Sequence, residues 1–158
     1  PVGSGEILTA KAATNFLLGM VSLAISMVFA AFVFDIPIRG SLLLLLAVSA
    51  LFLIVALGLG LVISTATKNQ FLACQFAIMG TFMPALMLSG FLYDILNMPP
   101  AVRAVTYLIP ARYYVTLLQT LFLAGDIPSV IIPCCITLGV FAVVLMSIAR
   151  LKAPKSLE

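Results

Sequence analysis

The chain has 158 residues, of which 64% are hydrophobic and 8% are charged, and its formal net charge is +3. A soluble domain carries about 25% charged residues, so this composition excludes a water-soluble globular protein and indicates an integral membrane protein. The basic residues are few and scattered between apolar runs, so no basic patch is available to bind a phosphate backbone.

The sequence contains no recognisable catalytic constellation. His is absent, which removes the usual general base and the commonest metal ligand. Cys74, Cys134 and Cys135 lie in apolar runs and are predicted to be small buried hydrophobic residues rather than metal ligands or disulfide partners. No glycine-rich loop is followed by Lys and Ser or Thr, so we expect neither nucleotide binding nor a cofactor in this chain.

Residues 1–11 read as a short polar lead-in, in which Ser4 can cap a helix that carries Glu6 in its first turn and Lys11 near the membrane. Residues 12–34 are uncharged and reach roughly 34 Å as a helix, which is enough for a first span. Within this span, small residues recur every fourth position and predict a face on which another helix packs closely. These residues are Ser22, Ser26 and Ala30.

A turn with proline and glycine at residues 35–40 returns the chain into a second span, residues 41–67. Ala56, Gly58 and Gly60 in this span suit close contact with a neighbouring helix. The third span is predicted at residues 71–93. Pro84 near its middle predicts a kink, which can be a hinge or a static bend, and Thr81 is one side chain that can bond the freed carbonyl.

Residues 94–128 contain two proline breaks and a short amphipathic helix over residues 111–124. The apolar face of this helix is expected to hold Tyr114, Leu117, Leu118, Leu121 and Phe122, and the polar face Arg112, Thr116, Gln119 and Thr120. Neither the segment with the proline breaks nor the amphipathic helix is long or apolar enough to cross a bilayer alone. The residues themselves leave two interpretations open, a broken hairpin that dips into the membrane and an interfacial loop with one surface helix.

Residues 129–149 form the fourth predicted span, and the tail at residues 150–158 is basic. An even number of spans places both termini on the same side of the membrane. Five basic residues then lie on that side and three on the other, which favours cytoplasmic termini and an external hairpin. The first group is Lys11, Lys68, Arg150, Lys152 and Lys155, and the second is Arg39, Arg103 and Arg112.

The ends of the chain suggest a fragment of a longer protein. The sequence opens at Pro1 without a start Met, and the closing Leu157 and Glu158 look like a cloning remnant. We therefore expect one all-α transmembrane domain, residues 12–149, that forms the C-terminal part of a larger membrane protein.

Four segments of the third span and the hairpin carry a family resemblance. Residues 88–94, 97–100, 106–114 and 121–125 read LSGFLYD, NMPP, TYLIPARYY and LFLAG. This stretch resembles the C-terminal signature of ABC-2 type permeases, the membrane subunits of bacterial ABC exporters, including those of the multidrug and daunorubicin-resistance kind. The resemblance covers most of the chain.

The resemblance implies a permease subunit in the bacterial inner membrane that expels a hydrophobic or amphipathic compound, either drug-like or a lipid. It also implies two partners, a second permease subunit and a separate ABC ATPase subunit that binds and hydrolyses ATP, so that this chain is not itself an enzyme. Two alternatives stay open: a non-transporting membrane scaffold or assembly subunit, and an exporter of polysaccharide or lipid-linked cargo.

Specific residues gain roles from the resemblance. The lead-in is similar to the end of the cytoplasmic segment that docks on the ATPase, and its candidate contacts are Glu6, Ile7, Leu8 and Lys11; the alternative is a solvated leader that anchors the first span. Pro84 is the candidate hinge. The candidate residues of an external gate are Ser89, Gly90, Phe91, Tyr93, Pro99, Pro100, Pro110, Arg112, Tyr113 and Tyr114.

Two of these assignments have simpler alternatives. The aromatic residues of the hairpin can close or line an exit, or they can anchor the hairpin at the membrane interface. Arg112 can pair with Asp94 or with lipid head groups.

Overall fold

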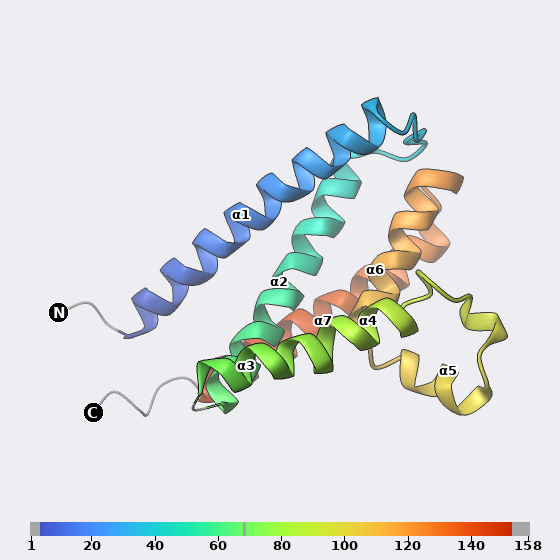
Figure 1. Ribbon diagram of the computed structural model, residues 1–158. Helices are drawn as coiled ribbons and strands as arrows, with labels where there is room; N and C mark the ends of the chain where they lie inside the picture. The colour runs from blue at the N-terminus through green and yellow to red at the C-terminus, as the bar shows by residue number, and fades with distance from the viewer. Residues whose placement is uncertain (1–3, 68, 153–158) are drawn as a thin grey trace.

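The computed structural model describes residues 4–67 and 69–152, and within these residues the regular structure is helical, with no strand. Four helices or helical rods there are long and apolar enough to cross a membrane. They are α1 (Ser4–Phe32), α2 (Leu42–Ala66), the rod formed by α3 (Gln70–Ala77), η1 (Ile78–Phe82) and α4 (Met83–Leu88), and α7 (Pro128–Lys152) (Figure 1). The predicted all-α membrane fold with four spans is confirmed.

The first helix carries Glu6 in its first turn, as the sequence predicted. α1 starts at Ser4 and continues without a break to Phe32, so no structural boundary separates the polar lead-in from the first span. Glu6, Ile7 and Lys11 lie on the first turns of this helix, and all three are exposed. The expectations for Pro1, Lys68, Lys155, Leu157 and Glu158 fall outside the described residues.

The third span is shorter than expected. Its helix ends at Leu88, and the last five residues of the predicted span, Ser89–Tyr93, form bends instead. Gly90 has φ +87, a left-handed conformation that a helix cannot contain and that favours glycine. The remaining part, Gln70–Leu88, is still long enough to count as a spanning segment.

Pro84 does not break the third rod, because a π-helix precedes it. The amide of Met83 donates to the carbonyl of Ile78, five residues back, in the η1 segment. The wider turn places the proline in the first turn of α4, where a missing amide hydrogen costs little. The predicted bond from Thr81 is not formed: the structure shows no hydrogen bond of its hydroxyl to any described residue. No observation tests the hinge role of Pro84.

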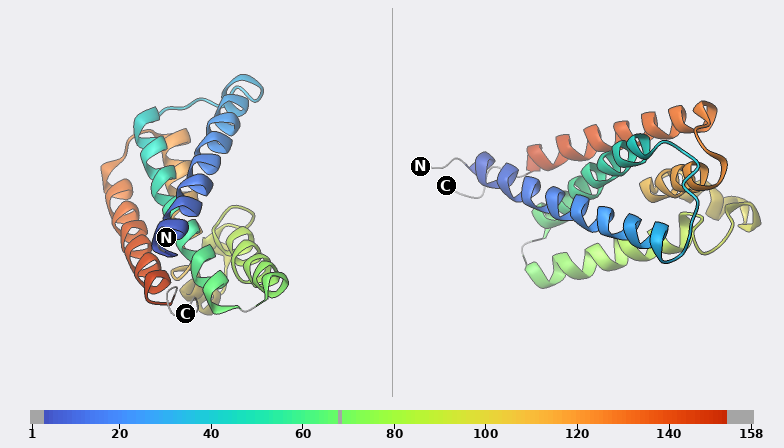
Figure 2. Two further views of the ribbon diagram at one scale, coloured as in Figure 1. Left: turned by 90° about the vertical axis from the view of Figure 1, so that its left-hand side faces the viewer. Right: turned by 90° about the horizontal axis from the view of Figure 1, so that it is seen from above.

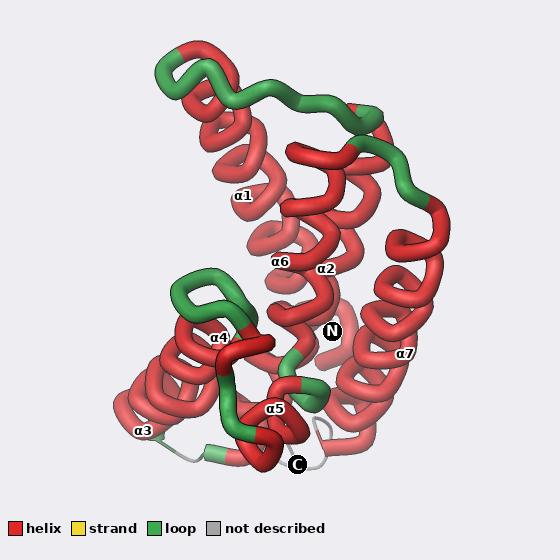
Figure 3. Tube along the Cα trace, turned by 90° about the vertical axis from the view of Figure 1, so that its right-hand side faces the viewer, coloured by secondary structure: helices red, strands yellow, loops and turns green. Residues whose placement is uncertain are grey.

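The core of the bundle is formed by α2, α7 and the helical segment that directly precedes α7. This segment consists of α6 (Pro110–Gln119) and the π-helix η3 (Thr120–Ala124). We call the buried residues shared by these elements the core cluster: Leu45, Val48, Val55, Leu117, Leu121, Ile131, Leu138 and Ala142. Seen from the right of the view of Figure 1, α6 runs along α2 and α7 (Figure 3). The predicted apolar face of α6 is the face that packs here.

Small residues set the closest helix contact. A Cβ atom added at Gly58 would lie 2.9 Å from the Cβ of Leu145, so α2 and α7 can approach this closely only with glycine at that position. By contrast, Ser22 and Ser26 of α1 are exposed, so the small-residue face predicted there does not pack against another described helix. Gly19 of α1 approaches α2 closely, beside the side chain of Leu53.

The first turns of α1 and the last turns of α7 lie at the same end of the bundle (Figure 2). Lys11, Arg150 and Lys152 are therefore at one end, whereas Arg39 lies in the loop between α1 and α2 at the other. The cytoplasmic location of this end stays a prediction.

Candidate functional site

The segment between α4 and α7 is a broken pair of helices, as the proline positions predicted. After the 3-10 turn η2 (Ile95–Asn97), α5 (Pro100–Thr106) and α6 each start with a proline, the residue best suited to the first helical position. Ile109 between them is extended, as a residue before proline prefers. α5 projects from the bundle, and α6 packs into it (Figure 1).

The break between α5 and α6 is fixed by one arginine. Arg112 donates a short hydrogen bond to the hydroxyl of Thr106, and its guanidinium lies 3.9 Å from the ring centroid of Tyr107. The hydroxyl of Tyr113 donates to the carbonyl of Tyr107 at 3.0 Å. Arg112 thus folds back onto the preceding turn, and of its two predicted partners Asp94 is wrong: Asp94 instead accepts the amide of Leu96.

A second arginine holds the entry to α5. Arg103 donates to the carbonyl of Leu96 at 2.7 Å, which ties α5 back to the η2 turn. Its Nε atom is buried and has no hydrogen-bond partner among the described residues. Arg103 therefore braces the loop from within the hairpin.

Two tyrosines join α6 to the spanning helices. The ring of Tyr114 stacks on Phe52 of α2, with centroids 4.2 Å apart and planes 1° from parallel. Its hydroxyl also shares a 2.9 Å hydrogen bond with Ser49, which is fully buried. Tyr113 packs on the other side against Phe141 of α7, at 6.2 Å between centroids. The hairpin is therefore anchored to both neighbours by aromatic contacts.

The far end of the hairpin is bonded to the loop between α1 and α2. The amide of Gly40 donates to the carbonyl of Leu121 at 2.8 Å, and the amide of Ser41 donates to a carboxylate oxygen of Asp126 at 2.9 Å. Gly125, with φ +89, turns the chain between these two acceptors. We call this pair of bonds the outer clamp; it fixes the end of η3 beside the start of α2.

These contacts give the direction of α6. Its first residues lie beside the middle of α2, near Phe52, and its last residues lie beside the N-terminal end of α2. The chain therefore enters the bundle at Pro110 about halfway along α2 and returns to the end at which α2 begins.

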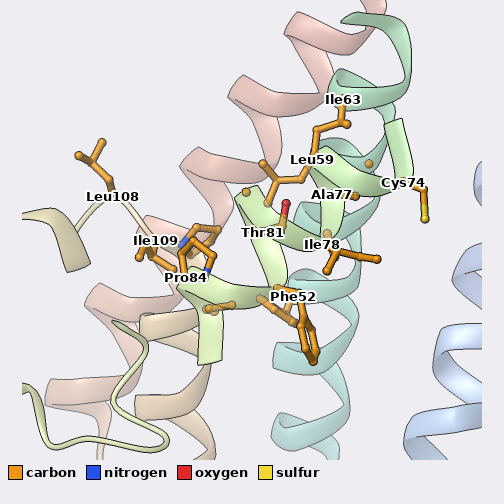
Figure 4. A pocket seen from close by; sticks show the side chains of 17 residues that line it. Phe52, Leu59, Ile63, Cys74, Ala77, Ile78, Thr81, Pro84, Leu108 and Ile109 are labelled. Atoms are coloured by element: carbon orange, nitrogen blue, oxygen red, sulfur yellow. The ribbon is translucent and has the colours of Figure 1, made fainter. Parts of the chain in front are cut away.

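A cavity of about 530 Å³ lies between the third rod and the turn from α5 to α6. Pro84 of the third rod and Pro110 of the hairpin both line it, although no sequence pattern indicates that they are neighbours. The remaining wall comes from α2, with Phe52 and Leu59 on the cavity side (Figure 4). Cys74 also lines this cavity and is exposed, so its prediction as a buried residue is wrong.

The other candidate gate residues are not gathered at one point. Ser89 is buried at the end of α4, and Phe91 and Tyr93 beside it are 67% and 63% exposed. Pro99 and Pro100 lie at the exposed start of α5. The structure thus divides the candidates into a packed group on α6 and an exposed group around η2.

Sequence reasoning missed the residues that hold the hairpin: Gly40, Ser41, Ser49, Phe52, Thr106 and Asp126. Asp126 precedes the first residue of α7 by two positions, which is a pattern that suggests a cap for α7 rather than a bond to a loop 85 residues away. Within the described residues, no group of His, Cys, Asp and Glu could hold a metal ion.

The helices and the anchored hairpin define a multi-pass membrane protein of the all-helical class. The ABC-2 type transporter family matches residues 1–123, and the chain belongs to this family.

Two relatives extend the likeness beyond the family match. The chain is 46% identical to the protein named "Probable multidrug ABC transporter permease YbhS" of Escherichia coli (strain K12), over 97% of this chain and 41% of that protein. It is 27% identical to "Probable multidrug ABC transporter permease YbhR" of the same organism, over 78% of this chain and 33% of that protein. The chain thus spans less than half the length of these relatives. No solved structure matches it.

Proposed function

We propose that this chain is part of a permease subunit of an ATP-driven ABC exporter, which moves a hydrophobic or amphipathic compound out of the bacterial cytoplasm. The observation that carries the proposal is the ABC-2 family match over residues 1–123, together with 46% identity to a protein whose name states multidrug transport. The cargo is drug-like or a lipid, because the spanning helices offer almost no ionisable groups to an ionic cargo.

The energy source is a separate ABC ATPase subunit, so this chain itself binds no ATP and no other cofactor. The candidate contacts are Glu6, Ile7, Leu8 and Lys11 on the first turns of α1. Glu6 and Lys11 are exposed and carry opposite charges, and Ile7 between them is 50% exposed, so all three side chains are accessible to a partner. This end of the bundle faces the cytoplasm of the inner membrane, and both termini lie there.

The hairpin re-enters the membrane from the outer surface and forms part of the exit. Supporting this proposal, α6 begins beside the middle of α2 and returns to the end of α2 opposite the cytoplasmic side. Gly90, Phe91, Tyr93, Pro99 and Pro100 surround the exposed half of the exit, and Pro110, Arg112, Tyr113 and Tyr114 its packed half; Ser89 is buried at the base of the exposed half. Pro84 is the hinge of the adjoining rod, and a second permease subunit and membrane lipid complete the assembly.

A paired charge removal tests the coupling role. In the full-length permease, Glu6→Ala with Lys11→Ala should lower Hoechst 33342 efflux about tenfold, which corresponds to about 1.4 kcal/mol of lost coupling free energy. The matched control, Asp35→Asn with Arg39→Ala, removes the same kinds of charge from the exposed loop at the other end and should leave efflux within about twofold.

The amount of permease in the membrane is measured for each variant. Unchanged efflux in the Glu6 and Lys11 variant would refute the coupling residues. A full-length permease that neither co-purifies with an ATPase subunit nor supports efflux would favour the alternative class, a non-transporting membrane scaffold.

A further inference from the structure

We propose that the cavity between α2, the third rod and the turn from α5 to α6 binds an uncharged, hydrophobic small molecule that carries a hydrogen-bond donor. The proposal deepens the proposed function, since such a molecule is the kind of cargo proposed above, but the binding site itself rests on the geometry and chemistry of the cavity wall.

The size of the cavity fits a drug-sized molecule. Its volume of about 530 Å³ lies within the range of roughly 300–1,000 Å³ that is usual for small-molecule sites. Three separate elements supply the wall, so the site is concave rather than a flat helix face (Figure 4).

The lining excludes charged ligands. It contains no charged side chain, and apart from Cys74 and Thr81 its residues are apolar. An ion bound among these groups would have no partner of opposite charge, which is costly at membrane depth.

One acceptor in the wall favours a ligand with a donor group. The hydroxyl of Thr81, which forms no hydrogen bond to a described residue, lies on this wall, and its oxygen can accept a hydrogen bond. Polar groups without partners are expensive in an apolar site, so a ligand N–H or O–H group is stabilised here.

The position of the cavity explains how a bound molecule would influence the hairpin. The wall includes the π-helix next to Pro84 and the break at Pro110, at both of which the chain departs from regular α-helical geometry. A molecule held between them contacts the third rod and the start of α6 at once. Its binding therefore favours one spacing of these two elements over others.

Photolabelling of the full-length permease in membranes tests the site. The probe is 4-(hydroxymethyl)benzophenone, which is uncharged, hydrophobic and carries one donor; benzophenone, which has no donor, is the comparison. Peptide mass spectrometry should find the alcohol attached to residues of the cavity wall. Labelling spread evenly over the exposed faces of α1 and α3 would overturn the proposal.

A pair of glycine substitutions provides a matched test. Neither Gly60 nor Gly139 has an atom within 4 Å of an added Cβ, and both lie inside spanning helices, but only Gly60 lines the cavity. Gly60→Leu should reduce labelling of the wall at least about fivefold because its side chain occupies the cavity, and Gly139→Leu should leave it unchanged. Ala56→Leu serves as a second filling variant if Gly60→Leu does not accumulate. Equal labelling in a filling variant and in Gly139→Leu overturns the site.

A third variant tests the class of ligand. Thr81→Val keeps the shape of the side chain and removes its hydroxyl, so labelling by the alcohol should fall about two- to tenfold while labelling by benzophenone stays the same. If the two probes label the wild-type wall equally and Thr81→Val changes neither, the cavity takes any apolar chain, such as a lipid tail, and the proposed ligand class is wrong.

Efflux separates this inference from the proposed function. Cavity labelling in a permease that transports nothing with its ATPase supports the binding site and contradicts the exporter. Efflux by a permease in which Gly60→Leu leaves the labelling of the cavity wall unchanged supports the exporter and contradicts the binding site.

Discussion

The helices divide into a packed trio, α2, α6 with η3, and α7, and a loosely attached pair, α1 and the third rod. Every residue of the core cluster belongs to the trio. In the most apolar stretch of α1 and of the third rod, no residue is buried, compared with 28% of the corresponding stretch of α2. Length and hydropathy therefore do not distinguish helices that hold the fold from helices that lie against it.

The difference has a physical cause that is specific to membranes. Lipid tails are as apolar as leucine, so burial of a leucine between helices gains little hydrophobic free energy. What stabilises the trio is close fit, stacking and hydrogen bonding, as in the contact at Gly58, the ring pair of Phe52 and Tyr114, and the bond to Ser49. α1 and the third rod have few such contacts and leave apolar faces for lipid or for other subunits.

The largest expected effect comes from a substitution that creates a void inside the packed trio. Leu117→Ala should lower the free energy of unfolding of the full-length permease by about 2–3 kcal/mol. The substitution removes packing contacts and leaves a void, and both destabilise the fold although the leucine side chain would not reach water on unfolding in a membrane. Leu17→Ala in α1, where the side chain is 65% exposed, should change it by less than about 0.5 kcal/mol. Equilibrium unfolding in mixed micelles of SDS and dodecylmaltoside measures both. Equal losses would contradict the division into trio and pair.

A single added methyl group sharpens the comparison. Gly58→Ala should cost about 1–2 kcal/mol, since the new Cβ meets the Cβ of Leu145, which cannot move without α7. At Gly19 the new Cβ would lie 2.7 Å from the far end of the flexible Leu53 side chain, which can rotate away. Gly19→Ala should therefore be close to neutral in the same unfolding experiment. A larger loss at Gly19 would show that α1 is held as tightly as α7.

The smallest effect concerns the outer clamp. Asp126 and Asp94 each accept one backbone amide, but the partner of Asp126 is 85 residues away and that of Asp94 is two residues away. Asp126→Ala should cost about 1 kcal/mol and raise hydrogen exchange in residues 39–41, which the clamp holds.

The matched variant Asp94→Ala should leave the exchange of residues 39–41 unchanged, because its bond lies within the η2 turn. Unchanged exchange in the Asp126 variant would show that the bond to Ser41 contributes nothing to the position of the loop.

Features marked by a helical repeat of apolar residues or by a strongly apolar composition could be predicted from the sequence. The uncharged runs indicated four spans, and the spacing of Tyr114, Leu117 and Leu121 gave the packed face of α6. The start of each hairpin helix followed from Pro100 and Pro110. In each case, the determining signal lies within one turn or one span.

The rest depended on contacts between distant segments or on local backbone geometry without a sequence signal. The pair expected between Arg112 and Asp94 was plausible from charge alone, but Thr106 and Tyr107 are nearer along the chain and satisfy the guanidinium first. Gly90 ends the third helix early, although its neighbours are apolar enough to continue a span. The meeting of Pro84 and Pro110 follows only from how α2 and the third rod pack.

The unbroken course of α1 has a geometric consequence for any force applied at its exposed first turns. Its 29 residues make a rod about 43 Å long, so a tilt of about 5° about the Glu6 end carries Phe32 sideways by about 4 Å. That displacement arrives at the loop whose Gly40 and Ser41 are bonded to the tip of the hairpin. A small rotation on one side of the bilayer is thereby converted into an ångström-scale pull on the other, with no need for α1 to bend.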